Sequence, residues 1–147
     1  MTEYKSDFLQ TLQTRGFIKQ TTHDAELDEY CASGTPVCYY GCDATANSLH
    51  VGSLVGIMTL RHFQKAGGKP IVLIGGGTTK VGDPTDKEQS RPILTEAEIA
   101  ANAKGIRKAF EPFLTFGDGP TDAIMVNNDD WLSALGYINF LREYGKH

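Results

Sequence analysis

Short apolar runs that end in turn-forming residues alternate with helix-like segments over most of this sequence. Three runs have the composition of buried strands: TPVCYYGCD at residues 35–43, KPIVLIGGG at 69–77 and AIMV at 123–126. Longer segments with helical spacing of apolar residues separate them. Because strands and helices that alternate in this order form parallel pairs through right-handed crossovers, the sequence predicts an α/β fold: an open parallel sheet with helices on both faces.

Two short helices are expected before the first strand. The first is capped by Ser6 and closed at Gly16, and the second covers about residues 22–34. Neither helix carries residues that suggest chemistry. At 147 residues the chain has the usual size of one domain, so we expect one core.

Three further helical segments are expected. Apolar residues fall on more than one face of residues 54–68, which predicts a largely buried helix. Thr95 and Glu98 have the spacing of a capping box at the start of the next helix, which should stop or kink near Pro112. A helix pair is expected from Trp131 onward.

The charge and composition exclude several classes of protein. A formal net charge of −4 argues against a nonspecific nucleic-acid coat or a polybasic membrane anchor, which need clustered Lys and Arg. No stretch has the pattern of a signal peptide or a membrane span, so we expect a cytoplasmic protein with no membrane partner. Cys31, Cys38 and Cys42 lack the spacing of a disulfide framework or a metal knuckle, so we expect reduced, buried thiols and no protein-bound metal.

Polar and glycine residues gather where the predicted strands end. Gly41 and Asp43 close the first strand, residues 75–83 follow the second, and Asn127 and Asn128 follow the third. In open parallel sheets, ligands bind beyond the carboxyl ends of the strands. The three loops together therefore indicate one binding site.

The segment GCDATANSLHVG, at residues 41–52, joins the first strand to the next helix. Gly52 lets a ligand approach the backbone, the helix N-terminus offers free N–H groups, and His50 can donate a hydrogen bond to a phosphate oxygen. An ATP triphosphate fits this description; the alternative is a capped turn with a surface histidine. The glycine-rich segment at residues 75–83 matches neither a P-loop nor a dinucleotide fingerprint.

Several segments resemble one family in order along the chain. YYGCDATANSLHVGSL resembles the HIGH-signature segment of class I aminoacyl-tRNA synthetases, in particular their tyrosyl branch, with the tryptophanyl branch as nearest rival. GGGTTKVGDPTDKEQSR is similar to that branch's Gly-Asp-Pro loop, and NNDDW and FLREYGKH match later landmarks. The similarity covers residues 30–147. It implies the first half of a Rossmann-like synthetase fold over residues 36–147, preceded by a helical lead-in at 1–35.

The resemblance implies a tyrosine–tRNA ligase. In this family, tyrosine and ATP form tyrosyl-adenylate, and the tyrosyl group then passes to tRNA(Tyr). The substrate's own carboxylate attacks the α-phosphate, so the protein contributes positioning and charge stabilisation rather than a nucleophile. The resemblance also implies Mg²⁺ with the ATP, and a homodimer in full-length members.

The resemblance assigns four residues to tyrosine. Tyr39 would hydrogen-bond the phenol hydroxyl of the substrate. Asp83 would hold the substrate ammonium, with Thr78 and Asn128 nearby. The alternative for Asp83 is that it only starts a turn with Pro84.

The resemblance assigns the turn after the first strand to ATP. The backbone at Gly41 and Asp43 would approach the acyl-phosphate region, and Gly52 belongs to the ATP site. Thr45 and His50 would act catalytically, contacting the phosphates as pyrophosphate develops charge.

Two cations on the loop after Asp83 complete the implied catalytic set. Lys87 and Arg91 would close over the pyrophosphate; without the resemblance they would be read as solvated loop charges. The chain departs from the family pattern at the signature and in the loop. Ser53, counted with the ATP site, replaces the signature's second histidine. In the loop, Thr85 and Asp86 stand where many relatives have glycine or serine, and Asp86 places a carboxylate near the phosphate path.

The chain stops ahead of the family's KMSKS-type loop and its tRNA-reading parts. We therefore expect half an active site and no aminoacylation by this chain alone. Two alternatives remain: a catalytically idle interaction module, and a nucleotidyltransferase of similar fold. In the family the first strand lies in the middle of the sheet, so here VCYYGC is expected to form an exposed apolar edge prone to pairing.

Overall fold

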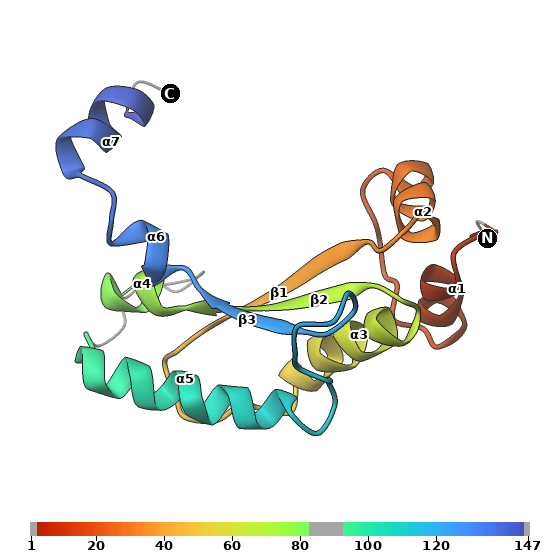
Figure 1. Ribbon diagram of the computed structural model, residues 1–147, viewed down its shortest axis with the longest axis horizontal. Coiled ribbons are helices and arrows are strands. Elements are labelled where there is room, and N and C mark those ends of the chain that lie inside the picture. Colours follow the sequence, from red (N-terminus) through yellow and green to blue (C-terminus); the bar gives the residue numbers. More distant parts are fainter. Residues whose placement is uncertain (1–2, 83–92, 146–147) are drawn as a thin grey trace.

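Three parallel strands form the centre of the structure, a computed structural model that describes residues 3–82 and 93–145 (Figure 1). The strands are β1 (Val37–Asp43), β2 (Lys69–Gly75) and β3 (Ile124–Asn127), in the order β1-β2-β3. Asp43 lies opposite Gly75, and Ile74 lies opposite Asn127. The predicted parallel α/β sheet is confirmed, and its carboxyl ends meet at one edge.

The two crossover helices, α3 (Ser53–Lys65) and α5 (Glu96–Phe110), lie on the same side of the sheet in Figure 1. The strand order runs in one direction, and right-handed crossovers that follow one direction fall on one face. Helices were expected on both faces of the sheet; among the described residues, the crossover helices cover one face. On the other face, Ile71 and Leu73 of β2 remain half-buried.

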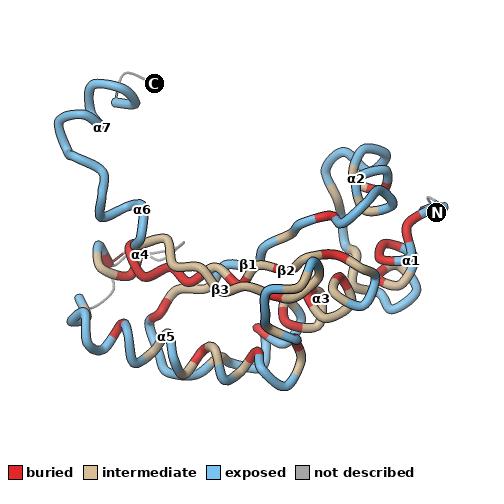
Figure 2. The backbone as a smooth tube through the Cα atoms, viewed as in Figure 1, coloured by how far each residue is buried: buried red, intermediate tan, exposed pale blue. Residues whose placement is uncertain are grey.

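The main core fills the space between the sheet and these two helices. Figure 2 shows the buried stretch along the strands and repeated buried positions in α5. Every strand and both helices contribute side chains or flanking residues to this cluster, whose largest fully buried side chains are Val72, Ile74, Leu60, Ile106 and Phe110. The apolar spacing that predicted α5 thus corresponds to its buried face.

A second cluster holds the N-terminal helices, α1 (Asp7–Thr14) and α2 (Asp24–Ala32), against α3. Phe8 meets Phe63 edge to face, with ring centroids 4.9 Å apart. Ser6 caps α1 by accepting a hydrogen bond from the N–H of Leu9, and Gly16 has a φ of +71°, as the sequence predicted. Both expected lead-in helices are present.

Helix α3 differs from its prediction as a largely buried helix. Ile57, Leu60 and Phe63 are buried, whereas Leu54 is 41% exposed and Val55 is 60% exposed. The reason is that the sheet covers one side of the helix, so the apolar residues on its other side at the N-terminal end have no cover among the described residues.

The turn after β2 contains a short helix, α4 (Gly76–Lys80), which the sequence did not predict. From the sequence, the apolar run was expected to continue through Gly77, and the residues after it were expected to form a loop without periodicity. Five residues are too few to show a helical period, and three successive glycines lower helix propensity. Helix α5 ends at Phe110, ahead of Pro112, as expected.

The chain ends in two helices, α6 (Asp129–Leu132) and α7 (Tyr137–Tyr144). Helix α6 starts slightly ahead of the predicted position at Trp131. Helix α7 projects from the sheet and is exposed along its whole length (Figures 1 and 2). In the ranges that the structure describes, no helix combines the length and apolar character needed to cross a membrane.

The three cysteines are free thiols and are half-buried rather than buried. Burial raises the pKa of Cys38 to about 12 and that of Cys42 to about 11. Both thiols are therefore protonated near neutral pH and act as small apolar side chains in the strand.

The outer edge of β1 generates the first prediction. Within residues 3–82 and 93–145, β1 pairs only with β2, and its side chains Val37 and Tyr39 are 42% and 70% exposed. Unpaired strand edges with apolar side chains template pairing with another chain. We expect light scattering to show concentration-dependent self-association. Val37→Lys should reduce this self-association, because it adds charge to the edge. Val81→Lys, at an exposed valine outside the sheet, is the control; a chain that stays monomeric at high concentration contradicts the prediction.

A second prediction concerns the core. Phe110 is fully buried where α5 meets the sheet. Phe110→Ala leaves a cavity and should lower the free energy of unfolding by about 3–5 kcal/mol. Lys108→Ala, exposed on the same helix, should change it by less than about 0.5 kcal/mol. Urea unfolding measures both, and equal effects would argue against the assigned core.

Candidate functional site

Polar residues from all three strand ends meet at the carboxyl edge of the sheet. Thr78 of α4 donates a hydrogen bond from Oγ1 to Oδ1 of Asp43, over 3.0 Å. Asn128 accepts the N–H of Gly77 at 2.8 Å and donates to Thr78 Oγ1 at 3.4 Å. Thr78 and Asn128, predicted to contact tyrosine, are thus brought together with Asp43, predicted to contact ATP.

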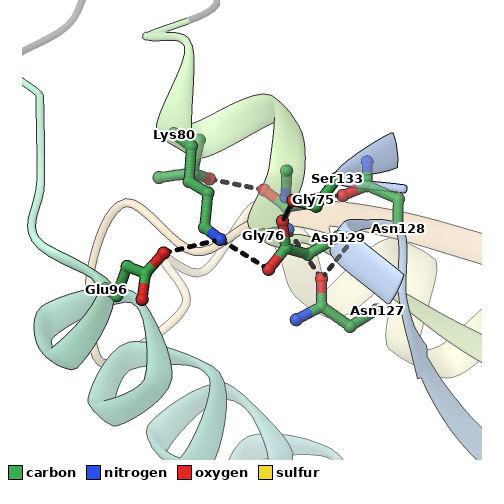
Figure 3. A network of polar contacts seen from close by, with 10 residues as sticks. Gly75, Gly76, Lys80, Glu96, Asn127, Asn128, Asp129 and Ser133 are labelled. Carbon is green, nitrogen blue, oxygen red and sulfur yellow. Dashed lines mark hydrogen bonds and ion pairs between the residues drawn. The ribbon is translucent and has the colours of Figure 1, made fainter. Parts of the chain in front are cut away.

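A network of hydrogen bonds and ion pairs fixes α4 against the end of β3 and against α5 (Figure 3). Asn127 Oδ1 accepts the N–H groups of Gly76 and Asp129, at 3.1 and 3.0 Å. The ammonium of Lys80 lies 2.7 Å from Asp129 and 3.1 Å from Glu96. Carboxylates of α5 and α6 therefore converge on the ammonium of Lys80, which belongs to α4.

The charges in this network support one another. The hydrogen bond to Asp129, and then that to Glu96, raises the pKa of Lys80. Lys80 likewise lowers the pKa of Asp129, with a smaller contribution from Ser133. Both shifts favour the charged forms of Lys80 and Asp129, so the ion pair is present at neutral pH.

A cavity of about 480 Å³ opens beside the turn from β1 to α3. Four residues predicted for the ATP site line it: Asp43, Thr45, His50 and Ser53. The remaining lining comes from the same strand and turn: Tyr40, Cys42, Ala46, Ser48 and Leu49. One continuous segment of chain thus supplies the whole wall that the structure describes.

His50 has a defined hydrogen-bond role in this cavity. Its Nδ1 accepts the backbone N–H of Gly52 at 3.0 Å, so in the neutral ring the proton lies on Nε2. A Cβ at residue 52 would lie 2.7 Å from Cε1 of His50, so this arrangement needs glycine. His50 is exposed and can donate through Nε2 to an anionic ligand.

The N-terminus of α3 lies beside His50. Gly52 occupies the N-cap position and makes no side-chain capping bond. Ser53, the variant position of the signature, is the first residue of the helix and is 7% exposed. The free N–H groups that the sequence predicted here are not found at Gly52, Ser53 or Leu54, because these N–H groups donate to Nδ1 of His50 and to the carbonyls of His50 and Val51.

Other predicted site residues lie elsewhere. Tyr39 is 70% exposed and lines a separate, largely apolar cavity of about 370 Å³, together with residues of α1, the loop after it and α3. Gly41 is exposed, and a Cβ there would meet nothing closer than Leu73 at 3.8 Å, so the protein itself does not require glycine at that position.

The predicted residues Asp83, Lys87 and Arg91 lie outside the described residues, as does Asp86. Across the described ranges, no group of three or more His, Cys, Asp and Glu side chains is arranged to hold a metal ion.

Several residues that organise the site were not predicted from the sequence. All of α5 and β3 lies between Lys80 and Asp129 in the chain, and no sequence period links the two residues. Asn102 could have been noticed, because it lies beside Ala103 on the stripe that runs from Ile99 to Ile106. A polar residue next to a buried stripe suggests a specific buried partner.

Comparison with known proteins identifies the family. The family model of class I tRNA synthetases (W and Y) matches residues 32–147. The chain belongs to the class I tRNA synthetases of this W and Y branch. It is 65% identical over 144 residues to a tyrosine–tRNA ligase of a Caulobacter species, and 58% identical over 142 residues to one of Beijerinckia indica. In both cases the alignment covers nearly all of this chain and 34% of the relative, so the chain spans about a third of these curated relatives.

A solved structure agrees with this synthetase assignment. The C-terminally truncated mitochondrial tyrosyl-tRNA synthetase of Coccidioides posadasii superimposes with a TM-score of 0.73 at 27% sequence identity. The superposition covers 97% of this synthetase chain and 40% of that protein. The predicted Rossmann-like synthetase fold is thereby confirmed.

The Lys80–Asp129 pair generates a prediction about acid stability. Because the pKa of Asp129 is lowered in the folded state, its ionised form stabilises the fold above its unfolded pKa near 3.8, and this stabilisation is lost as pH falls through the folded pKa. Asp129→Asn should therefore be less stable than the parent chain at pH 7, with the difference shrinking below about pH 4.

Urea unfolding at a series of pH values measures this difference. Asp130→Asn, at the exposed neighbouring carboxylate, is the matched control and should show a smaller pH-dependent difference. A gap between parent and Asp129→Asn that stays constant from pH 7 to pH 3 is the contrary result.

Proposed function

We propose that this chain forms the ATP-phosphate corner and part of the tyrosine site of a tyrosine–tRNA ligase. The observation that carries the proposal is the cavity shared by Asp43, Thr45, His50 and Ser53, in a chain 65% identical to a curated tyrosine–tRNA ligase. The chain spans about a third of that relative. The complete reaction, with tRNA(Tyr) as acceptor, is accordingly proposed for the longer protein.

The proposed first step needs no protein nucleophile. A carboxylate oxygen of tyrosine attacks the α-phosphorus of ATP; the bond from that phosphorus to the bridging oxygen breaks, and pyrophosphate leaves. Negative charge builds on the leaving phosphates. We propose that the Nε2–H group of His50 and the hydroxyl of Thr45, both in the lining of the cavity, stabilise this charge.

Mg²⁺ would enter with the nucleotide. The described residues offer no cluster of metal-ligating side chains, and Mg²⁺ is commonly bound through substrate phosphates with few protein ligands. Bound in this way, it would neutralise phosphate charge. Lys87 and Arg91 are proposed to approach the same pyrophosphate.

The tyrosine site is proposed on the other side of Asp43. Tyr39 would hydrogen-bond the substrate phenol, a group that phenylalanine lacks, so bound phenylalanine would leave Tyr39 without this partner. Asp83 is proposed to hold the ammonium. Thr78 and Asn128 are proposed to lie beside the ammonium; a hydrogen bond joins them to each other, and a second joins Thr78 to Asp43.

Thermal shift and calorimetry test the proposal with three ligands: Mg-ATP, L-tyrosine and a nonhydrolysable tyrosyl-adenylate analogue. We expect the analogue to raise the melting temperature most, because it engages both parts of the site. His50→Ala should weaken Mg-ATP binding by about tenfold, the cost of one hydrogen bond to a charged group. His23→Asn, which removes an exposed imidazole at the start of α2, should leave binding unchanged.

The outcomes separate the competing functions. A shift with Mg-ATP but no preference for the analogue favours a nucleotidyltransferase of similar fold. No shift with any ligand favours a catalytically idle interaction module. Tyrosine-dependent exchange of pyrophosphate into ATP by this chain, abolished in His50→Ala, would show that the described half site is active by itself, against our expectation.

A further inference from the structure

The loop from Ala44 to Gly52 carries the proposed phosphate ligands, and its first residue is anchored on both sides. Ala44 is fully buried. Its N–H donates to Oγ1 of Thr79 at 3.0 Å, and its carbonyl accepts Nδ2 of Asn102 at 2.9 Å. Both backbone polar groups of Ala44 are thus bound by side chains from other elements, α4 and α5.

The Thr79 anchor connects two strand ends. Thr79 is 4% exposed, and its hydroxyl donates to the carbonyl of Gly75 at 2.6 Å while it accepts from Ala44. The end of β1 is therefore tied to the end of β2 beyond the last residues that pair in the sheet. A buried chain of hydrogen bonds in which each group is satisfied restricts its members to one arrangement.

A third contact supports the middle of the loop. The backbone of Asn47 rests on α5 at Gly105, where an added Cβ would lie 2.1 Å from the carbonyl oxygen of Asn47 and 2.8 Å from its carbonyl carbon. Backbone at this distance cannot yield without moving the loop. The loop is therefore supported on either side of Thr45.

We infer that Thr79, Asn102 and Gly105 are positioning residues that hold the loop so that Thr45 and His50 face the cavity. None of the three positioning residues lines that cavity, so they act through the backbone they support. This inference rests on the proposed function. It assigns to α5 a role in preorganising the nucleotide site in addition to covering the sheet.

Two variants test the inference in the full 147-residue chain. Asn102→Ala removes the donor to Ala44, and we expect Mg-ATP binding to weaken by about tenfold in calorimetry. Gly105→Ala should displace the loop and weaken binding at least as much, although alanine favours the helical state of α5. In both variants, hydrogen exchange of the amides of Ala44 and Ser53, which are hydrogen-bonded to Thr79 and to the carbonyl of His50 at the two ends of the loop, should accelerate about tenfold without ligand.

Two controls separate positioning from general stability. Ile106→Val removes a buried methyl group from the same helix and should lower stability while leaving Mg-ATP affinity and loop exchange unchanged. Ala101→Ser changes an exposed neighbour of Asn102 and should alter neither the Mg-ATP affinity nor the loop exchange. Equal loss of affinity in Ile106→Val and Asn102→Ala would overturn the inference.

The exchange measurement keeps the inference distinct from the proposed function. If the parent chain binds no Mg-ATP, the proposed function fails for this chain, and loop exchange alone decides the inference. Unchanged exchange of the Ala44 and Ser53 amides in both Asn102→Ala and Gly105→Ala overturns it, whatever the result with nucleotide.

Discussion

The rest of the structure depends on the parallel pairing of β2 with β1 on one side and with β3 on the other. Parallel strands point the same way, so their carboxyl ends meet at one edge of the sheet. This pairing places Asp43, Gly75 and Asn127 side by side, although the residues come from distant parts of the chain. The cavity proposed for the ATP phosphates lies at this edge.

Short polar connections convert the aligned strand ends into an ordered site. Asn127 and Asn128 accept N–H groups from the start of α4, and Lys80 at its end binds carboxylates of α5 and α6. Backbone donors that the short helix leaves unpaired are satisfied in this way by side chains. The site is therefore built on elements whose positions are coupled, which suits a reaction that depends on positioning rather than on a protein nucleophile.

The sequence predicted the features that have a local physical cause. The strands appear as apolar runs, the capping box at Thr95 forms with Glu98, and Gly16 takes the positive φ expected of a helix end. The turn with His50 and Gly52 could be predicted from the sequence, because its residues lie within a few positions of each other. Asn102 and Thr79 were missed because their roles depend on Ala44, which is close to them only after folding.

The coverage of the sheet was predicted less well for a related reason. Alternation of strands and helices indicates crossovers, but the strand order decides which face each crossover helix covers. The exposure of Tyr39 on β1 follows from that order, not from its own chemistry. By itself, the sequence determined the element types, most of their ends and the identity of the residues at the strand tips. Only the tertiary structure decided which tips and side chains meet, because those contacts join residues from separate elements across the chain.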